Sequence, residues 1–249
     1  MANWGGLANG ALGYGLYFLQ RGYYNRSFAQ SIVEELVQGI ARYAIHTPDG
    51  CYWKSGLNHT SPKAGLFSPD ETAAVLLFLA RIVEMGLCPA ERMEGIAQKA
   101  VSYIETCRRN TGDIETGYTL LRAGIAFNNA AWARSGREDL RRYAISRQEN
   151  ADLIKDAGIV HGAAGLALLF DRITQIGNDP TIERAADFWY AQILRFGGHP
   201  DGYAGYMAAE HPWNLQINLA FCQGIMGIGS TLIRALHPEV HFDDLIWSV

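Results

Sequence analysis

Apolar and polar residues along this chain form segments of two kinds. Segments of the first kind are apolar on nearly every side, and several begin with two glycines three positions apart; they lie at residues 10–19, 72–83, 116–126, 162–170 and 224–232. This pattern is typical of helices that are buried on most of their faces. A glycine inside a helix costs about 1 kcal/mol relative to alanine. We therefore expect these glycines to serve close packing or function.

Segments of the second kind mix charged and apolar residues at three- and four-residue spacing, at residues 27–43, 90–108, 136–148 and 180–196. The two kinds alternate along the chain, at intervals typical of repeat architectures. This order predicts an all-α fold with two concentric layers of helices, an α/α toroid. An irregular helical bundle or solenoid is the alternative. No segment predicts a strand, and residues 46–69 and 197–221 are expected to form long irregular stretches.

Composition and charge exclude some classes of function. The chain has 249 residues, a formal net charge of −4 and a hydrophobic fraction of 49%. The negative charge argues against a general affinity for nucleic acid, and no apolar run is long enough to predict a membrane span. The first residues do not resemble a signal peptide. Four cysteines without a C-x-x-C pair favour reduced thiols and a cytoplasmic location.

Four motifs occur in an order that resembles the lanthionine synthetase C-like family: N-G-A-L-G-Y-G-L-Y-F-L at residues 9–19, D-G-C-Y-W-K at 49–54, D-A-G-I-V-H-G-A-A-G at 156–165, and the tail at 224–248. The resemblance implies one toroid domain over residues 1–249. Cyclases of this family hold zinc with two cysteines and a histidine. The zinc activates a cysteine thiolate of a precursor peptide, which adds to a dehydroamino acid and forms a thioether ring. The partners that the resemblance implies are a ribosomally made precursor peptide and a dehydratase.

The chain departs from the family at the zinc ligands. The histidine of the family's C-H-G motif is kept as His161, but Val160 stands at its cysteine position, and the alignment puts Asn110 at the other cysteine. Zinc sites need about four nitrogen, sulfur or oxygen ligands, so we expect no zinc and no other cofactor. The alternative is a rebuilt zinc site of His161, Cys222 and Cys107. Against that alternative, free cysteines are usually ordinary buried apolar residues.

The number of helices also departs from the family. About five inner-helix repeats are expected, fewer than the seven of the family's toroid. An incomplete toroid would expose the apolar flanks of its first and last inner helices, and exposed apolar patches commonly bind a partner. We therefore expect a piece of a longer protein, a toroid closed with fewer repeats, or a chain that a second subunit completes.

Three functions are consistent with these observations. The first is a degenerate family member, a pseudoenzyme of lanthipeptide biosynthesis that binds the precursor peptide as a scaffold, a chaperone or half of a split enzyme. The second is a metal-free thioether-forming cyclase, because proximity and orientation alone can lower a barrier by about 7–11 kcal/mol. In that case His161 would be the base, with Asp113 and Asn110 as supporting polar groups.

The third function is an unrelated activity on an α/α toroid, such as carbohydrate processing, which uses two carboxyl groups. Asp113 and Glu115 offer such a pair at the start of an inner helix. Acidic residues at helix N-termini are also favoured by the helix dipole alone.

Aromatic residues in the long irregular stretches are candidates for substrate binding: Trp53, Tyr203, Tyr206 and Trp213. Their rings could hold a peptide or a sugar. Packing over the end of the toroid is the alternative, because aromatic side chains bury large areas wherever they find a partner.

Overall fold

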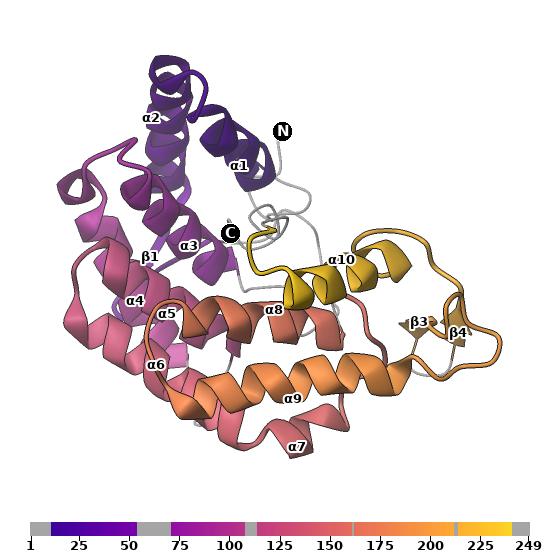
Figure 1. Cartoon of the computed structure of the whole chain (residues 1–249). Coiled ribbons are helices and arrows are strands. Elements are labelled where there is room, and N and C mark those ends of the chain that lie inside the picture. The colour runs from indigo at the N-terminus through magenta and orange to yellow at the C-terminus, as the bar shows by residue number, and fades with distance from the viewer. Residues whose placement is uncertain (1–10, 54–70, 108–113, 161, 212–213, 241–249) are drawn as a thin grey trace. The chain divides into compact units, whose positions relative to one another are not determined.

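The structure is a computed structural model that describes residues 11–53, 71–107, 114–160, 162–211 and 214–240 (Figure 1). The described residues are mostly helical, as the hydrophobic pattern predicted. They divide into two compact units, the first with the described residues up to Leu140 and the second with those from Arg141 onward. The expectation of a single toroid concerns how the units combine, and it stays a prediction. No helix in the described ranges is long and apolar enough to cross a membrane.

The first unit contains three helices of the apolar kind and the helices that cover them. In chain order its elements are α1 (Ala11–Arg21), α2 (Arg26–Tyr43), β1 (Ile45–Thr47), β2 (Gly50–Tyr52), α3 (Glu71–Glu84), the 3-10 helix η1 (Ala90–Arg92), α4 (Glu94–Cys107), α5 (Ile114–Ala126) and the larger part of α6 (Ala130–Ile145). The apolar helices contact one another in succession, α1 with α3 and α3 with α5. Each is paired with the helix that follows it, so the predicted alternation of apolar and amphipathic helices is present in this unit.

Close packing explains glycines of α5 and α6. A Cβ atom added to Gly124 would lie 2.2 Å from the backbone nitrogen of Ala133, and one added to Gly136 would lie 2.4 Å from the carbonyl oxygen of Gly117. Both distances are far shorter than a van der Waals contact. Larger residues at these positions would therefore push α5 and α6 apart.

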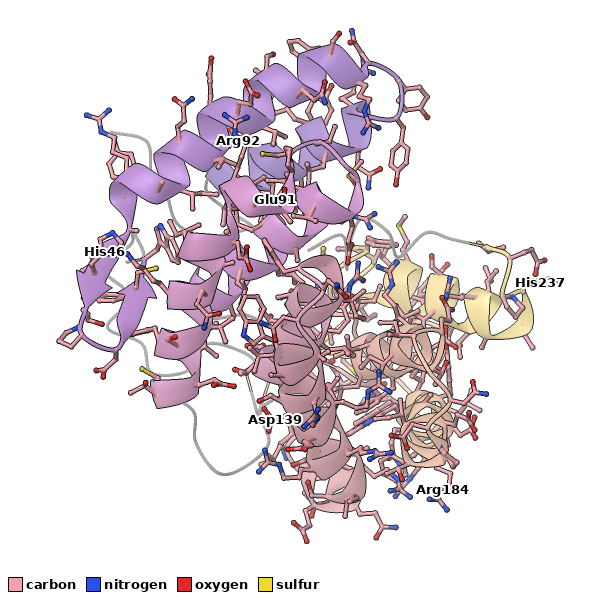
Figure 2. The ribbon with its side chains drawn as sticks, turned by 90° about the vertical axis from the view of Figure 1, so that its left-hand side faces the viewer. His46, Glu91, Arg92, Asp139, Arg184 and His237 are labelled. Carbon is pink, nitrogen blue, oxygen red and sulfur yellow. The ribbon has the colours of Figure 1, made fainter. Side chains whose placement is uncertain are left out.

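The second unit has the same alternation. Its elements are the remainder of α6, α7 (Arg147–Ala151), α8 (Ala163–Thr174), α9 (Pro180–Phe196), β3 (Ala208–His211), β4 (Asn214–Gln216) and α10 (Ile225–Leu236). Every residue of α8 from 163 to 170 is buried. The amphipathic α9 packs along α8, and its outer face carries exposed residues such as Arg184 (Figure 2). The apolar α10 contacts both α8 and α9.

The prediction that the chain has no strands was wrong. β1 pairs with β2 and β3 pairs with β4, each as an antiparallel pair of three or four residues per strand. Strands this short give little alternation to detect. The first pair depends on tertiary contact: a Cβ atom at Gly50 would fall 2.1 Å from the carbonyl oxygen of Lys99, so β2 lies directly on α4. The φ angle of Gly50, 140°, is also one that favours glycine.

Two expectations about the helices need qualification. α6 begins at Ala130, six residues before the predicted 136, because Asn129 caps it: its side-chain oxygen accepts hydrogen bonds from the amides of Ala131 and Trp132 at 3.1 and 3.2 Å.

The prediction of burial on most faces holds for α3, α5 and α8, whereas the first and last apolar helices are partly exposed. These exposed side chains are Tyr14 (75%) and Tyr17 (60%) on α1, and Met226 (61%), Ile233 (52%) and Leu236 (78%) on α10.

Candidate functional site

Two turns meet in the second unit, one before α8 and one before α10. The amides of Ile159 and Val160 both donate hydrogen bonds to the carbonyl oxygen of Cys222, at 3.2 and 3.1 Å. Val160 is the position at which the family resemblance places a zinc-binding cysteine. Cys222 itself lies in the turn just before α10. The structure therefore brings Cys222 to the backbone of Val160.

The buried carboxylate of Asp156 organises this junction. One of its oxygens, Oδ1, accepts a hydrogen bond from the amide of Gly158 at 2.9 Å, and Oδ2 accepts one from the amide of Ala209 in β3 at 2.8 Å. A Cβ atom at Gly162 would lie 2.3 Å from Oδ1, so glycine is required there. Sequence reasoning assigned no role to Asp156. The spacing Asp156-x-Gly158 could have indicated this role, because an aspartate side chain commonly accepts a hydrogen bond from the amide two residues later.

Glycines fix the second turn against α10. A Cβ atom at Gly224 would lie 2.1 Å from the carbonyl oxygen of Asn218, and one at Gly227 would lie 1.9 Å from that of Phe221. The amide of Ile225 also donates to the Asn218 carbonyl at 2.9 Å. The backbone from 218 to 224 is therefore held close to the first turn of α10, and this close approach accounts for the paired glycines of the sequence.

The described residues show where some of the candidate zinc ligands lie. Val160 is half-buried and its side chain has no metal-binding atom. Cys222 is exposed in the second unit, and Cys107 is exposed at the end of α4 in the first. Within the ranges that the structure describes, no three His, Cys, Asp or Glu residues are placed to hold one metal ion. His161, Asn110 and Asp113 lie outside the described residues.

The other two cysteines are buried in the first unit. Burial raises the pKa of the Cys51 thiol, and the nearby Lys99 offsets this effect only in part. The Cys51 sulfur contacts the carbonyl oxygen of Ile96 at 3.8 Å as a weak donor. Cys88 is 4% exposed. Both match the ordinary interpretation of a free cysteine as a small apolar residue.

The candidate aromatic residues divide by their exposure. Trp53 is only 7% exposed, and its indole nitrogen donates to the carbonyl oxygen of Ile40 at 2.9 Å, so it belongs to the core of the first unit. Tyr206 is partly buried, which raises its pKa, and its ring packs on Gly197. Tyr203 is 58% exposed. The structure thus favours packing for Trp53 and Tyr206 and leaves Tyr203 as a surface aromatic; Trp213 lies outside the described residues.

Of the two carboxylates in the carbohydrate alternative, the structure describes Glu115. Glu115 lies in the first turn of α5, with one oxygen buried. A different charged group on α5, Arg122, was not singled out by sequence reasoning. Arg122 forms a two-point ion pair with Glu84 of α3 and donates to the hydroxyl of Tyr118 at 3.0 Å. Burial acts to lower the pKa of Arg122, but these partners raise it overall, so the guanidinium stays charged and ties α5 to α3.

The family resemblance rests on the order and spacing of the motifs at residues 9–19, 49–54, 156–165 and 224–248. Comparison with known proteins adds no support to it. No protein-family model matches the chain, and neither does any curated protein.

Proposed function

We propose that the chain is a lanthionine synthetase C-like protein that binds a ribosomally made precursor peptide without zinc-dependent cyclase chemistry. The observation that carries the proposal is the junction of the Val160 and Cys222 turns. Through the family resemblance this junction corresponds to the C-H-G motif, yet an isopropyl group replaces the thiolate. Without zinc, a peptide thiol keeps a reference pKa of about 8.5 and is a poor nucleophile at neutral pH.

The arrangement of the helices supports the architectural part of the proposal. In each unit apolar helices contact one another, and amphipathic helices cover them. An α/α toroid is built from these two layers, and its closure, alone or with a second subunit, is part of what we propose. The exposed apolar side chains of α1 and α10 supply the surface that a further partner would cover.

Two measurements on the purified chain test the proposal. The first is metal content by inductively coupled plasma mass spectrometry, before and after chelator treatment, for which we expect no bound zinc. The second is calorimetric titration of the zinc-free chain with a synthetic Ser/Thr/Cys-rich peptide, for which we expect saturable binding. A length-matched Gly/Pro-rich peptide is the control and should bind more weakly.

The outcomes separate the three functions. Near-stoichiometric zinc would contradict the metal-free part of the proposal. Binding of maltohexaose without binding of the Ser/Thr/Cys-rich peptide would favour carbohydrate processing. Incubation with a dehydrated form of that peptide detects metal-free cyclisation, since addition of a thiol to a dehydroamino acid removes one free thiol and leaves the mass unchanged. Loss of that thiol with the native chain, but not with a His161→Ala variant, would make the chain an enzyme.

A further inference from the structure

One edge of the pair of strands β3 and β4 lies at Leu215, which is 42% exposed. The pair forms a sheet of two strands, so each strand has a partner on one side only. The far side of β3 is occupied by Asp156, which accepts a hydrogen bond from the amide of Ala209. Among the backbone hydrogen bonds of the described residues, none joins residues 215–217 to any segment other than β3.

The register shows which backbone groups point outward from this edge. Ala209 lies opposite Leu215, and the Ala209 amide points away from β4 toward Asp156. In an antiparallel sheet, residues of such a pair direct their N–H and C=O groups away from each other's strand. The N–H and C=O of Leu215 therefore lie on the free edge of β4, where they can bond to a further strand.

The side chains of β4 and of the residues just after it are apolar at alternate positions. Leu215, Ile217 and Leu219 are 42%, 55% and 52% exposed, and they are separated by Asn214, Gln216 and Asn218. No charged residue occurs between positions 214 and 223. Proteins usually protect an open edge strand with lysine, proline or a cover, and none of these protects β4 among the described residues. An uncharged edge with exposed apolar side chains suits the addition of a strand.

We infer that the free edge of β4 is a docking site for an extended, uncharged peptide segment with apolar side chains at alternate positions, which adds to the sheet as a third strand. The inference rests on the proposed function, in which the partner is an unfolded precursor peptide. The main chain of such a peptide pairs with Leu215, and its side chains lie beside Ile217 and Leu219. Asp156 joins β3 to the turn before α8, so the sheet to which the segment adds is tied to the junction of Val160 and Cys222.

A peptide suits this edge better than a second copy of the chain. β4 is only three residues long, and two copies paired edge to edge would bury far less area than the roughly 1,200–2,000 Å² of a stable interface. A flexible peptide can continue past β4 along Ile217 and Leu219. Its main-chain N–H and C=O groups can also pair with those of Leu215.

A backbone substitution tests the site directly. Leu215→Pro removes an N–H that does not bond to β3, and proline is tolerated at edge positions of this kind. Leu215→Val is the matched control, since it keeps the N–H and the apolar side chain. Ile217→Lys adds a charge at the edge without altering the backbone, and Leu153→Lys, at a position 65% exposed elsewhere in the second unit, is its control.

The probe is the synthetic peptide acetyl-Thr-Val-Thr-Val-Thr-Val-Thr-amide, compared with a form N-methylated at alternate residues. We expect fluorescence anisotropy to show binding of the unmethylated probe, and hydrogen exchange to show protection of the Leu215 amide when it binds. Leu215→Pro and Ile217→Lys should each weaken binding at least tenfold, whereas both controls should bind like the unchanged chain. Equal binding by all four variants, or by the methylated probe, would overturn the docking site.

Other outcomes distinguish this inference from the proposed function. If the Ser/Thr/Cys-rich peptide binds and both edge variants bind it unchanged, the docking site is wrong and the proposed function stands. If the threonine–valine probe binds and the Ser/Thr/Cys-rich peptide does not, the edge is retained and the proposed function falls. A dimer that disappears in Leu215→Pro would replace the peptide with a second copy of the chain.

Discussion

At the scale of single residues, Asp179 combines two roles at the start of α9. Its Oδ1 accepts a hydrogen bond from the amide of Thr181 at 3.0 Å, which caps the helix, and its Oδ2 forms an ion pair with Arg141. Burial acts to raise the pKa of this carboxyl, but the hydrogen bonds from Arg141 and the Thr181 amide outweigh it and hold the pKa below its usual value. The ionised carboxylate therefore stabilises the second unit.

We predict that Asp179→Ala lowers the free energy of unfolding by about 1 kcal/mol, the usual effect of removing a helix cap. Because the folded-state pKa is depressed, the contribution is fully present above the unfolded-state pKa of about 3.9 and is lost as the pH falls through the lower folded-state value. Urea unfolding of the unchanged chain and of Asp179→Ala between pH 7 and pH 2 shows whether their free energies of unfolding become equal at low pH. Asp187→Ala, at an exposed position of α9, is the control. A difference that stayed constant down to pH 2 would contradict the role of the charge.

At the scale of elements, α10 is held to α8 by a partly buried ion pair. The Arg234 side chain is 2% exposed, and its Nε and Nη2 donate to Oδ2 of Asp171 at 3.2 and 3.1 Å. Its Nη1 donates to the carbonyl oxygen of Val240 at 3.1 Å. One guanidinium thus joins α8, α10 and the segment after α10.

We predict that Arg234→Ala lowers the free energy of unfolding by about 3 kcal/mol. This is the low end for removing one partner of a buried ion pair, because Asp171 is 33% exposed and water can partly solvate it. Arg184→Ala, on the exposed face of α9, should change stability by less than about 0.5 kcal/mol. Chemical denaturation measures both variants. An equal effect at the two positions would show that the ion pair adds nothing to the packing of α10.

The helices could be predicted from the sequence more closely than the strands. Residues 180–196 were predicted as a helix and form α9 with these bounds, because Asp179 and Pro180 mark its start locally. The start of α6 was missed, since the capping residue Asn129 was not recognised. The strands β1 to β4 were missed because they are short and depend on contacts with distant parts of the chain, such as Lys99 and Asp156.

At the scale of the whole molecule, less of the candidate site could be predicted. The sequence suggested that Cys222 lies near the C-H-G-like motif, and the hydrogen bonds from Ile159 and Val160 to its carbonyl place it beside Val160. The burial of Trp53 could not be foreseen, because an aromatic residue in an irregular stretch looks the same whether it binds a ligand or fills a core. Asp156 was overlooked since its second partner, Ala209, is distant in sequence.

The four free thiols of the whole chain provide a test both of its packing and of the prediction that it binds no zinc. Cys107 and Cys222 are exposed, whereas Cys51 and Cys88 are buried, and burial raises the pKa of Cys51, so less of it is the reactive thiolate. We predict that two thiols react rapidly with Ellman's reagent in the native chain, and that the other two react only after unfolding. Cys222→Ala should remove one rapid thiol.

The same measurement with zinc separates the alternatives for Cys107 and Cys222. A rebuilt site of His161, Cys222 and Cys107 would hold both sulfurs as thiolates bound to the metal, and bound thiolates are shielded from the reagent. Because the resemblance places Val160 and Asn110 at the two cysteine positions, we expect equimolar zinc to leave both rapid rates unchanged. Slowing of both rates by zinc, reversed by a chelator and absent in His161→Ala, would establish the rebuilt site and replace metal-free peptide binding with metal-dependent chemistry.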